Sequence, residues 1–247
     1  MTSRAQWRNN VLYQFEDQTG ETVASDAPYQ FSDDFVGAGH SAGIPAAGSP
    51  VAGYPWVKKL TGTPTGVAIV ANGSLGQVAC ALAATNEVEE ASLYWNDNLS
   101  VDTTKFGSIE FRAALSVLPS AAGVVAALGL GSAWVGGPLG LARYLLFYWA
   151  ANGSLQVQTQ DGTGNTVSIA SLGVVSDTNM HTYRIDFGVG GDIAFWVDGK
   201  RLNTVGSVVW AATGANAVLQ PWMTVYKTAS PGVAILAVDK IDIFSGR

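Results

Sequence analysis

The chain has 247 residues, of which 48% are hydrophobic and 13% charged, and its formal net charge is −6. An average protein carries roughly a quarter charged residues, so this surface is poor in charge and we expect a partner to cover part of it. The thirteen Lys and Arg residues are scattered. This excludes a nucleic-acid partner, which would require clustered cations.

Disulfide, export and membrane signals are missing from the sequence. The single cysteine, Cys80, lies in an apolar stretch, which predicts a buried thiol without an internal disulfide. No apolar segment of a signal peptide follows Met1, so we expect folding in a reducing cytoplasm. Residues 113–142 carry no charge, but Pro119 and Gly136-Gly137-Pro138 would break a lipid-exposed helix. We therefore expect strand, loop and strand there, and no membrane partner.

Residues 1–30 differ from the remainder of the chain because they are polar and carry isolated aromatic side chains. Three of these aromatics are Trp7, Tyr13 and Phe15. A short helix over residues 5–15 is one interpretation of this segment. It has too few apolar residues for a core of its own, so it should gain order by lying on another surface. We thus divide the chain into an arm, residues 1–30, and a domain, residues 31–247.

Alternation of apolar and polar residues predicts β-strands in the domain. It runs through residues 108–113, 182–187 and 193–197, where Ile109, Phe111, Ile185 and Phe195 should face a core. The stretch 143–149 is apolar on both faces, as expected for a strand covered on both sides.

Two-residue turn signals separate these strands. They are the pairs Asn72-Gly73, Asn152-Gly153, Asp161-Gly162 and Asp198-Gly199. No segment beyond residue 30 keeps a helical apolar period with caps. The sequence therefore predicts an all-β domain, an antiparallel two-sheet jelly-roll sandwich.

Three segments carry a resemblance to a known superfamily. They are the opening strand 31–35 with Tyr54-Pro-Trp-Val57, the hairpin 181–201, and the closing pair 219–227 and 237–244. Together they resemble the concanavalin-A-like, or laminin-G-like, jelly-roll superfamily. The Asp33-Asp34-Phe35 opening is most similar to jelly-roll proteins of tailed-bacteriophage virions. That resemblance implies a decoration protein bound to a major capsid protein or another virion protein.

Acidic and histidine residues do not form a catalytic pattern. Glycanases of the superfamily place carboxylates at alternate positions of one strand, whereas Asp33-Asp34 and Glu89-Glu90 are adjacent and point to opposite faces. Glu110 stands alone on its strand, and Asp186 should form a solvated pair with Arg184. A lyase would need His40, in a glycine-rich loop, or His181, at the start of a core strand. We therefore predict a protein that is not an enzyme.

Metal and cofactor signals are equally thin. Asn96-Asp97-Asn98 with Asp102 could supply hard oxygen ligands for calcium. A solvated turn rich in Asp and Asn is the commoner outcome. We predict no cofactor.

The loop from Gly131 to Leu141 is apolar and uncharged, and it predicts a contact surface. Its large side chains, expected to be exposed unless a partner covers them, are Trp134, Val135, Pro138, Leu139 and Leu141. Trp149, Tyr183 and Trp196 lie on strands, where core packing explains them.

The leading hypothesis is a structural virion protein, a capsid decoration subunit and homo-oligomer that attaches through Trp7, Tyr13, Phe15 and the 131–141 loop. One alternative is a lectin-like adhesin or carbohydrate-binding module with a glycan ligand, which would need exposed Trp and Tyr residues on one sheet face. Another is a divergent polysaccharide hydrolase or lyase that uses Glu110 or His181.

Overall fold

The computed structural model describes residues 3–8, 11–16, 22–25, 29–36, 43–70, 76–151, 154–164, 166–170, 172, 177–188 and 191–246. Before residue 29 it describes backbone alone, apart from the side chain of Gln14.

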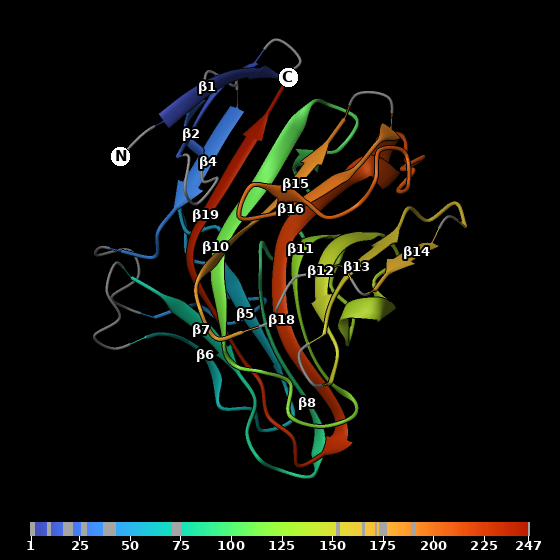
Figure 1. Cartoon of the computed structure of the whole chain (residues 1–247). Helices are drawn as coiled ribbons and strands as arrows, with labels where there is room; N and C mark the ends of the chain where they lie inside the picture. The colour runs from blue at the N-terminus through green and yellow to red at the C-terminus, as the bar shows by residue number, and fades with distance from the viewer. Residues whose placement is uncertain are drawn as a thin grey trace.

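Two eight-stranded antiparallel sheets pack face to face, and a three-stranded sheet precedes them (Figure 1). The back sheet has the order β17 (Lys200–Arg201), β16 (Ala194–Val197), β15 (His181–Phe187), β10 (Gly107–Val117), β19 (Ile235–Ser245), β7 (Val78–Ala81) and β6 (Gly66–Ile69), with β4 (Tyr29–Asp33) also paired to β19. The front sheet has the order β14 (Thr166–Ile169), β13 (Leu155–Gln160), β12 (Tyr144–Trp149), β11 (Val124–Gly131), β18 (Val218–Ser230), β8 (Glu87–Tyr94) and β5 (Val57–Thr61), with β9 (Val101–Asp102) also paired to β18. The predicted jelly-roll sandwich is confirmed.

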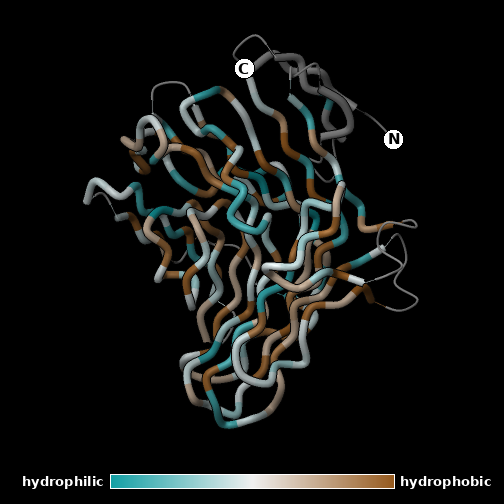
Figure 2. The backbone as a smooth tube through the Cα atoms, turned by 180° about the vertical axis from the view of Figure 1, so that it is seen from behind, coloured by the Kyte–Doolittle hydropathy of each residue, from teal (hydrophilic) through white to brown (hydrophobic). Residues whose placement is uncertain are grey.

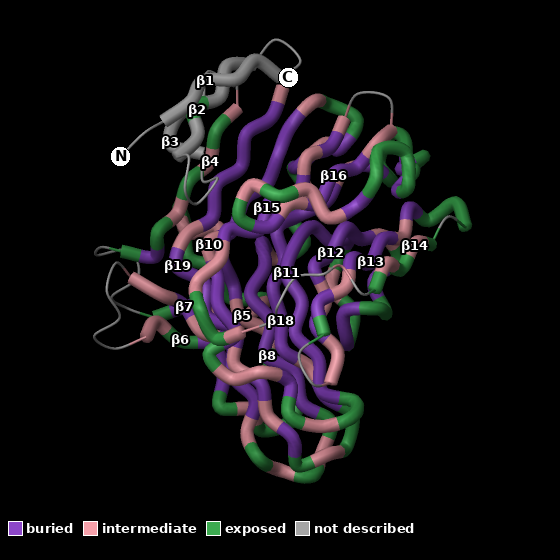
Figure 3. The backbone as a smooth tube through the Cα atoms, viewed as in Figure 1, coloured by how far each residue is buried: buried purple, intermediate pink, exposed green. Residues whose placement is uncertain are grey.

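The main core lies between the two large sheets and follows the predicted alternation. Ile109, Phe111, Ile185 and Phe195 are fully buried in it. The buried positions run along the central strands, while exposed positions gather in the loops (Figure 3). From behind, apolar positions alternate with more polar ones along several strands (Figure 2). Cys80 is buried as expected.

The Asp198-Gly199 pair makes the predicted two-residue turn, between β16 and β17. Asp198 has a φ of 49° and Gly199 a φ of 74°. Two successive positive φ values are the requirement of a type I′ hairpin turn, which Asp-Gly meets at low cost. The turn also places the Asp198 carboxylate next to the start of β15, where it accepts the Thr182 amide at 2.9 Å.

The uncharged stretch 113–142 forms the end of β10, a loop, β11 and a second loop, as predicted. No helix in the described residues is long and apolar enough to cross a membrane. The strand that follows residues 113–142, β12, is covered on both faces. Leu145, Phe147 and Trp149 point into the main core, whereas Tyr144 and Leu146 point into a second, smaller cluster.

The expectation of a helix over residues 5–15 is wrong. Residues Ser3–Arg8 form β1 and Val11–Glu16 form β2, which pair antiparallel, and β2 also pairs with β3 (Thr22–Ser25). Among the described strands, these three pair with no strand of the sandwich. Inter-strand hydrogen bonds satisfy the polar backbone without an apolar helical stripe, which this segment lacks. β4 begins at Tyr29, two residues before the opening strand expected at residue 31.

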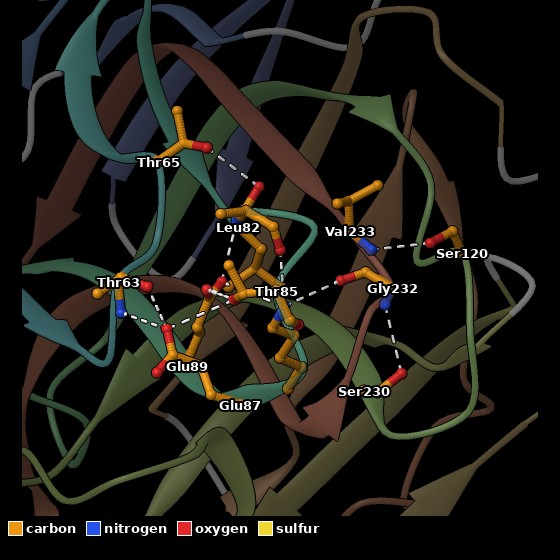
Figure 4. Close-up of polar contacts among 12 residues, drawn as sticks. Thr63, Thr65, Leu82, Thr85, Glu87, Glu89, Ser120, Ser230, Gly232 and Val233 are labelled. Carbon is orange, nitrogen blue, oxygen red and sulfur yellow. Dashed lines mark hydrogen bonds and ion pairs between the residues drawn. The ribbon is translucent and has the colours of Figure 1, made fainter.

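A buried ion pair closes the sandwich where β8 and β18 lie side by side. Lys227 and Glu89 are both fully buried, and Lys227 Nζ lies 3.3 Å from Glu89 Oε2. Lys227 Nζ also donates to the carbonyl oxygens of Ala83 and Thr85, each at 2.6 Å. Figure 4 shows the neighbouring contacts, including the Thr85 hydroxyl on Glu89. One ammonium group thereby binds the β7–β8 connection to β18.

The outer face of the back sheet is less solvated than the sequence suggests. Arg184 does contact Asp186, at 3.1 Å, but its side chain is 4% exposed, so the expectation of a solvated pair is wrong. Its guanidinium lies under the Trp196 ring, 4.9 Å from the centroid. Trp196 therefore lies outside the core predicted for it, whereas Trp149 and Tyr183 are core residues as expected.

Candidate functional site

The outer face of the front sheet carries the polar and aromatic side chains that the main core does not use. The strand register aligns them in four cross-strand rows. These rows are Thr61, Glu90, Tyr226 and Val125; Lys59, Ser92, Thr224, Ala127, Tyr148 and Gln156; Val57, Tyr94, Trp222, Gly129, Leu146, Gln158 and Ser168; and Gln220, Gly131, Tyr144, Gln160 and Thr166.

The loop between β11 and β12 folds back over one half of this face. Glu90 anchors it from below: Oε1 accepts the Trp134 indole N–H and Oε2 accepts the Gly137 amide, each at 3.0 Å. The Trp134 amide donates in turn to Asp97 at 2.7 Å. Gly137 has a φ of 78°, and a Cβ there would lie 3.3 Å from the Tyr226 ring. Glycine at this position lets the loop backbone lie flat on Tyr226.

The loop covers a second apolar cluster, which includes Tyr94, Trp222 and Tyr144. Leu141 belongs to this cluster and is 1% exposed, and Pro138 is also buried. The prediction that the whole loop is exposed is therefore wrong for these two residues, because the loop folds onto its own sheet. Trp134 is half-buried, while Val135 and Leu139 remain exposed, at 39% and 46%.

Glu90 holds the loop in place and is not available to a substrate. It is fully buried, and besides the two loop donors it accepts the Ser92 hydroxyl at 2.5 Å. Lys59 lies above the Trp134 ring, 4.8 Å from its centroid, on the other side of this contact. A general acid or nucleophile must reach the reacting bond, and this carboxylate is enclosed by protein.

A pocket of about 270 Å³ lies at the edge of the loop, between the loop and the outward side chains of the sheet. Its lining residues are Gly123, Val125, Gly136, Gly137, Pro138, Leu139, Gly140, Tyr148, Tyr226 and Thr228. Tyr148 and Tyr226 are half-buried, and neither phenol hydroxyl contacts another described group at hydrogen-bonding distance. Burial, followed by the neighbouring Tyr144, raises the pKa of Tyr148. Tyr148 therefore remains a neutral phenol that can donate and accept.

Amide side chains continue the face beyond Tyr148. Gln156 lies opposite Tyr148 in the register and Gln158 lies two residues further along β13. Gln158 Nε2 donates to the Gln156 amide oxygen and to the Ser168 hydroxyl, each at 2.8 Å. Because the Gln156 amide oxygen accepts from Gln158, the orientation of the Gln156 amide group is fixed. An aromatic ring beside fixed amides and hydroxyls suits a neutral polyhydroxylated ligand.

The two residues of the hydrolase or lyase alternative, Glu110 and His181, do not share a site. Glu110 and Arg184 lie on the outer face of the back sheet, at 3.9 Å from each other. His181 lies on the same strand pair, but its position alternates with Arg184 and shares the inward face of Tyr183. Glu110 and His181 thus belong to opposite faces of one sheet.

His181 is held between two carboxylates. Its Nδ1 lies 2.6 Å from Asp198 Oδ2 and its Nε2 lies 2.9 Å from Asp177 Oδ1. Burial lowers the pKa of His181, but hydrogen bonds to Asp177 and Asp198 and their charges outweigh it, so the net pKa is raised. With both ring nitrogens engaged, the imidazole binds the β14–β15 connection to the β16–β17 turn.

Of the remaining predicted site residues, the calcium candidates accept hydrogen bonds within the protein, and the others lack described side chains or lie outside the described residues. Asn96 accepts the Gly48 amide, Asp97 accepts the Gln220 amide side chain, and Asp102 accepts Thr104 groups. No group of three or more His, Cys, Asp or Glu residues that could hold a metal occurs in the described part of the chain. Trp7 lies in β1, and Tyr13 and Phe15 lie in β2, without described side chains; His40 lies outside the described residues.

The sequence predicted that Glu90 points away from Glu89, but it did not predict the contact of Glu90 with the loop or the positions of Tyr148 and Tyr226. Their positions on the outward face depend on register, which pairs strands far apart in the chain. One signal was present: the alternating run Gln156-Val-Gln-Thr-Gln160 marks a strand with amides on one face.

Comparison with known proteins finds similarity in structure but not in sequence. No family model and no curated protein matches the chain. A protein of unknown function from Shewanella oneidensis superimposes with a TM-score of 0.59 at 13% identity, covering 88% of this chain and 86% of that one. An endo-1,3-β-glucanase from Streptomyces sioyaensis gives 0.56 at 17% identity, covering 87% and 95%. The carbohydrate recognition domain of Emp47p gives 0.54 at 13% identity, covering 83% and 95%. These likenesses establish the fold alone: the chain folds as a two-sheet jelly-roll sandwich of the concanavalin-A-like kind.

Proposed function

We propose that this chain is a non-catalytic carbohydrate-binding module whose ligand lies in the pocket beside Tyr148, on the outer face of the front sheet. The observation that carries the proposal is the half-buried Tyr148, between an apolar pocket and the amides of Gln156 and Gln158, with a hydroxyl that hydrogen-bonds no group among the described residues. Sugar rings have an apolar face that packs on aromatic rings and a polar edge that hydrogen-bonds amides and hydroxyls. A carbohydrate recognition domain with the same fold supports this choice.

The distribution of carboxylates supports binding without catalysis. Retaining glycosidases need two carboxyl groups about 5–5.5 Å apart, and inverting ones about 6.5–9.5 Å. In the four outward rows of the front sheet, Glu90 is the one carboxylate, and it is enclosed by the loop. The glucanase among the structural relatives makes hydrolysis the rival activity.

A glycan array followed by calorimetry tests the proposal. We expect binding of a neutral glycan, and Tyr148→Ala should weaken it at least about tenfold, as removal of a central aromatic contact does. Trp196→Ala is the matched control, because it removes a half-buried aromatic from the outer face of the opposite sheet. Equal losses in the two variants, or no binding to any neutral glycan, would overturn the proposal. Release of reducing ends that Glu110→Gln or His181→Ala abolishes would establish the hydrolase instead.

A structural virion role is the second candidate, and the N-terminal sheet favours it. β1, β2 and β3 pair with one another and with no described strand of the sandwich, as expected for an attachment element. The exposed side chains of Val135 and Leu139 on a charge-poor molecule offer an additional contact surface. In this role the chain would decorate a capsid as an oligomer, bound to the major capsid protein or another virion protein.

Truncation tests this role. Residues 1–28 should be removed rather than 1–30, because Tyr29 pairs with Ser245 of β19. The truncated chain should keep the unfolding midpoint of the full chain and lose occupancy on purified particles. Val135→Asp should weaken occupancy as well, with Val209→Asp, an exposed valine on another loop, as control. If the truncated chain and the Val135→Asp variant both decorated particles normally, the attachment role would be contradicted.

A further inference from the structure

We infer that the pocket beside Tyr148 takes a neutral sugar that carries an acetamido group. The inference rests on the proposed glycan-binding function and specifies the sugar class. The pocket volume of about 270 Å³ is below the roughly 300–1,000 Å³ of sites for drug-sized ligands. It therefore suits one substituted ring rather than a long segment of a polysaccharide.

The pocket lining is mainly hydrocarbon, and three of its residues carry hydroxyl groups. Val125, Pro138 and Leu139 contribute aliphatic carbon, and Tyr148 and Tyr226 contribute aromatic side chains. The hydroxyls come from the same two tyrosines and from Thr228, which is exposed. An acetamido group matches this pattern, because its methyl needs an apolar seat while its amide needs hydrogen-bonding partners nearby.

A sugar hydroxyl fits the same apolar part of the pocket poorly. A hydroxyl buried against carbon loses its hydrogen bonds to water without replacement, whereas a methyl gains from leaving water. The pocket should thus bind an acetamido sugar more tightly than the parent hexose.

Charge around the pocket selects against acidic sugars. None of the lining residues is charged. The Glu90 carboxylate lies behind the pocket wall, where its Oε2 would be 3.9 Å from a Cβ placed on Gly136. Because that carboxylate is shielded from water, it repels an anion in the pocket more strongly than a solvated one would. Lys59 is directed at the Trp134 ring on the other side of the loop.

Calorimetry of the full chain with N-acetylglucosamine, glucose, fucose and N-acetylneuraminic acid tests this selectivity. N-acetylglucosamine should bind at least about tenfold more tightly than glucose, the usual effect of a methyl-sized group in an apolar pocket. Fucose distinguishes a bare methyl from an acetamido group, and N-acetylneuraminic acid adds a carboxylate to the same acetamido group. Leu139→Asp should remove the preference for N-acetylglucosamine, and Val209→Asp should keep it.

The outcomes separate the two levels of the proposal. Equal affinity for glucose and N-acetylglucosamine, tighter binding of fucose, or undiminished binding of N-acetylneuraminic acid would overturn the acetamido assignment and leave the glycan-binding function standing. Absence of binding to any neutral sugar, in calorimetry and on the array, would overturn the binding function itself.

Discussion

Replacement of Lys227 by Met removes a fully buried positive charge while keeping the length of the side-chain stem. Both Lys227 and Glu89 are fully buried. The substitution leaves the Glu89 carboxylate without its counter-charge, and it removes the donor to the carbonyl oxygens of Ala83 and Thr85. Breaking a buried pair from one side costs about 3–5 kcal/mol. A typical domain has a free energy of unfolding of about 5–15 kcal/mol, so this single change should remove a large part of it.

Urea denaturation measures this cost, provided that the denaturant slope of the variant equals that of the native chain. Lys200→Met is the matched control, because Lys200 is exposed on β17 and its loss should change stability by less than about 0.5 kcal/mol. Glu89→Gln in the Lys227→Met background should recover part of the loss, since it removes the unpaired charge, and a double-mutant cycle gives the coupling. A cost below about 1 kcal/mol for Lys227→Met would refute the reasoning, because it would mean that water or another cation reaches Glu89.

Three further predictions concern the core, the histidine clamp and the loop anchor. Phe195→Ala should cost about 3–5 kcal/mol, because Phe195 is fully buried with its ring 5.2 Å from that of Phe147; a change below about 1 kcal/mol in urea denaturation would contradict the inward assignment. The raised pKa of His181 means that its stabilising contribution is complete below pH about 6.5 and lost as pH rises through the folded-state value. His181→Ala should therefore lower the melting temperature more at pH 5.5 than at pH 8.5, and equal losses at both would argue against the clamp. Glu90→Gln should loosen the loop, because one amide oxygen replaces two acceptors, and hydrogen exchange at Gly137 should accelerate while exchange in β10 is unchanged.

The sequence by itself determined the fold class and the inward face of the long strands. Alternation in residues 108–113 and 182–187 needs no knowledge of partners, because neighbouring side chains on a strand point to opposite faces. The Asp198-Gly199 turn was equally local, since its backbone angles depend on those two residues. Such features are encoded within a few residues, so they can be read directly.

Tertiary structure alone decided where the candidate site lies. Glu90, Tyr148 and the 131–141 loop share one face because β12, β11, β18 and β8 pair in that order, and nothing local specifies their register. The loop has the composition of an exposed contact surface, but Leu141 and Pro138 are buried, since the outer face of its own sheet offers an apolar seat next to the Glu90 acceptors. In the same way, the polar N-terminal segment forms strands, because pairing between β1 and β2 satisfies the backbone hydrogen-bonding groups of both strands. Contacts between residues distant in the chain therefore set the site, whereas local periodicity set the fold class.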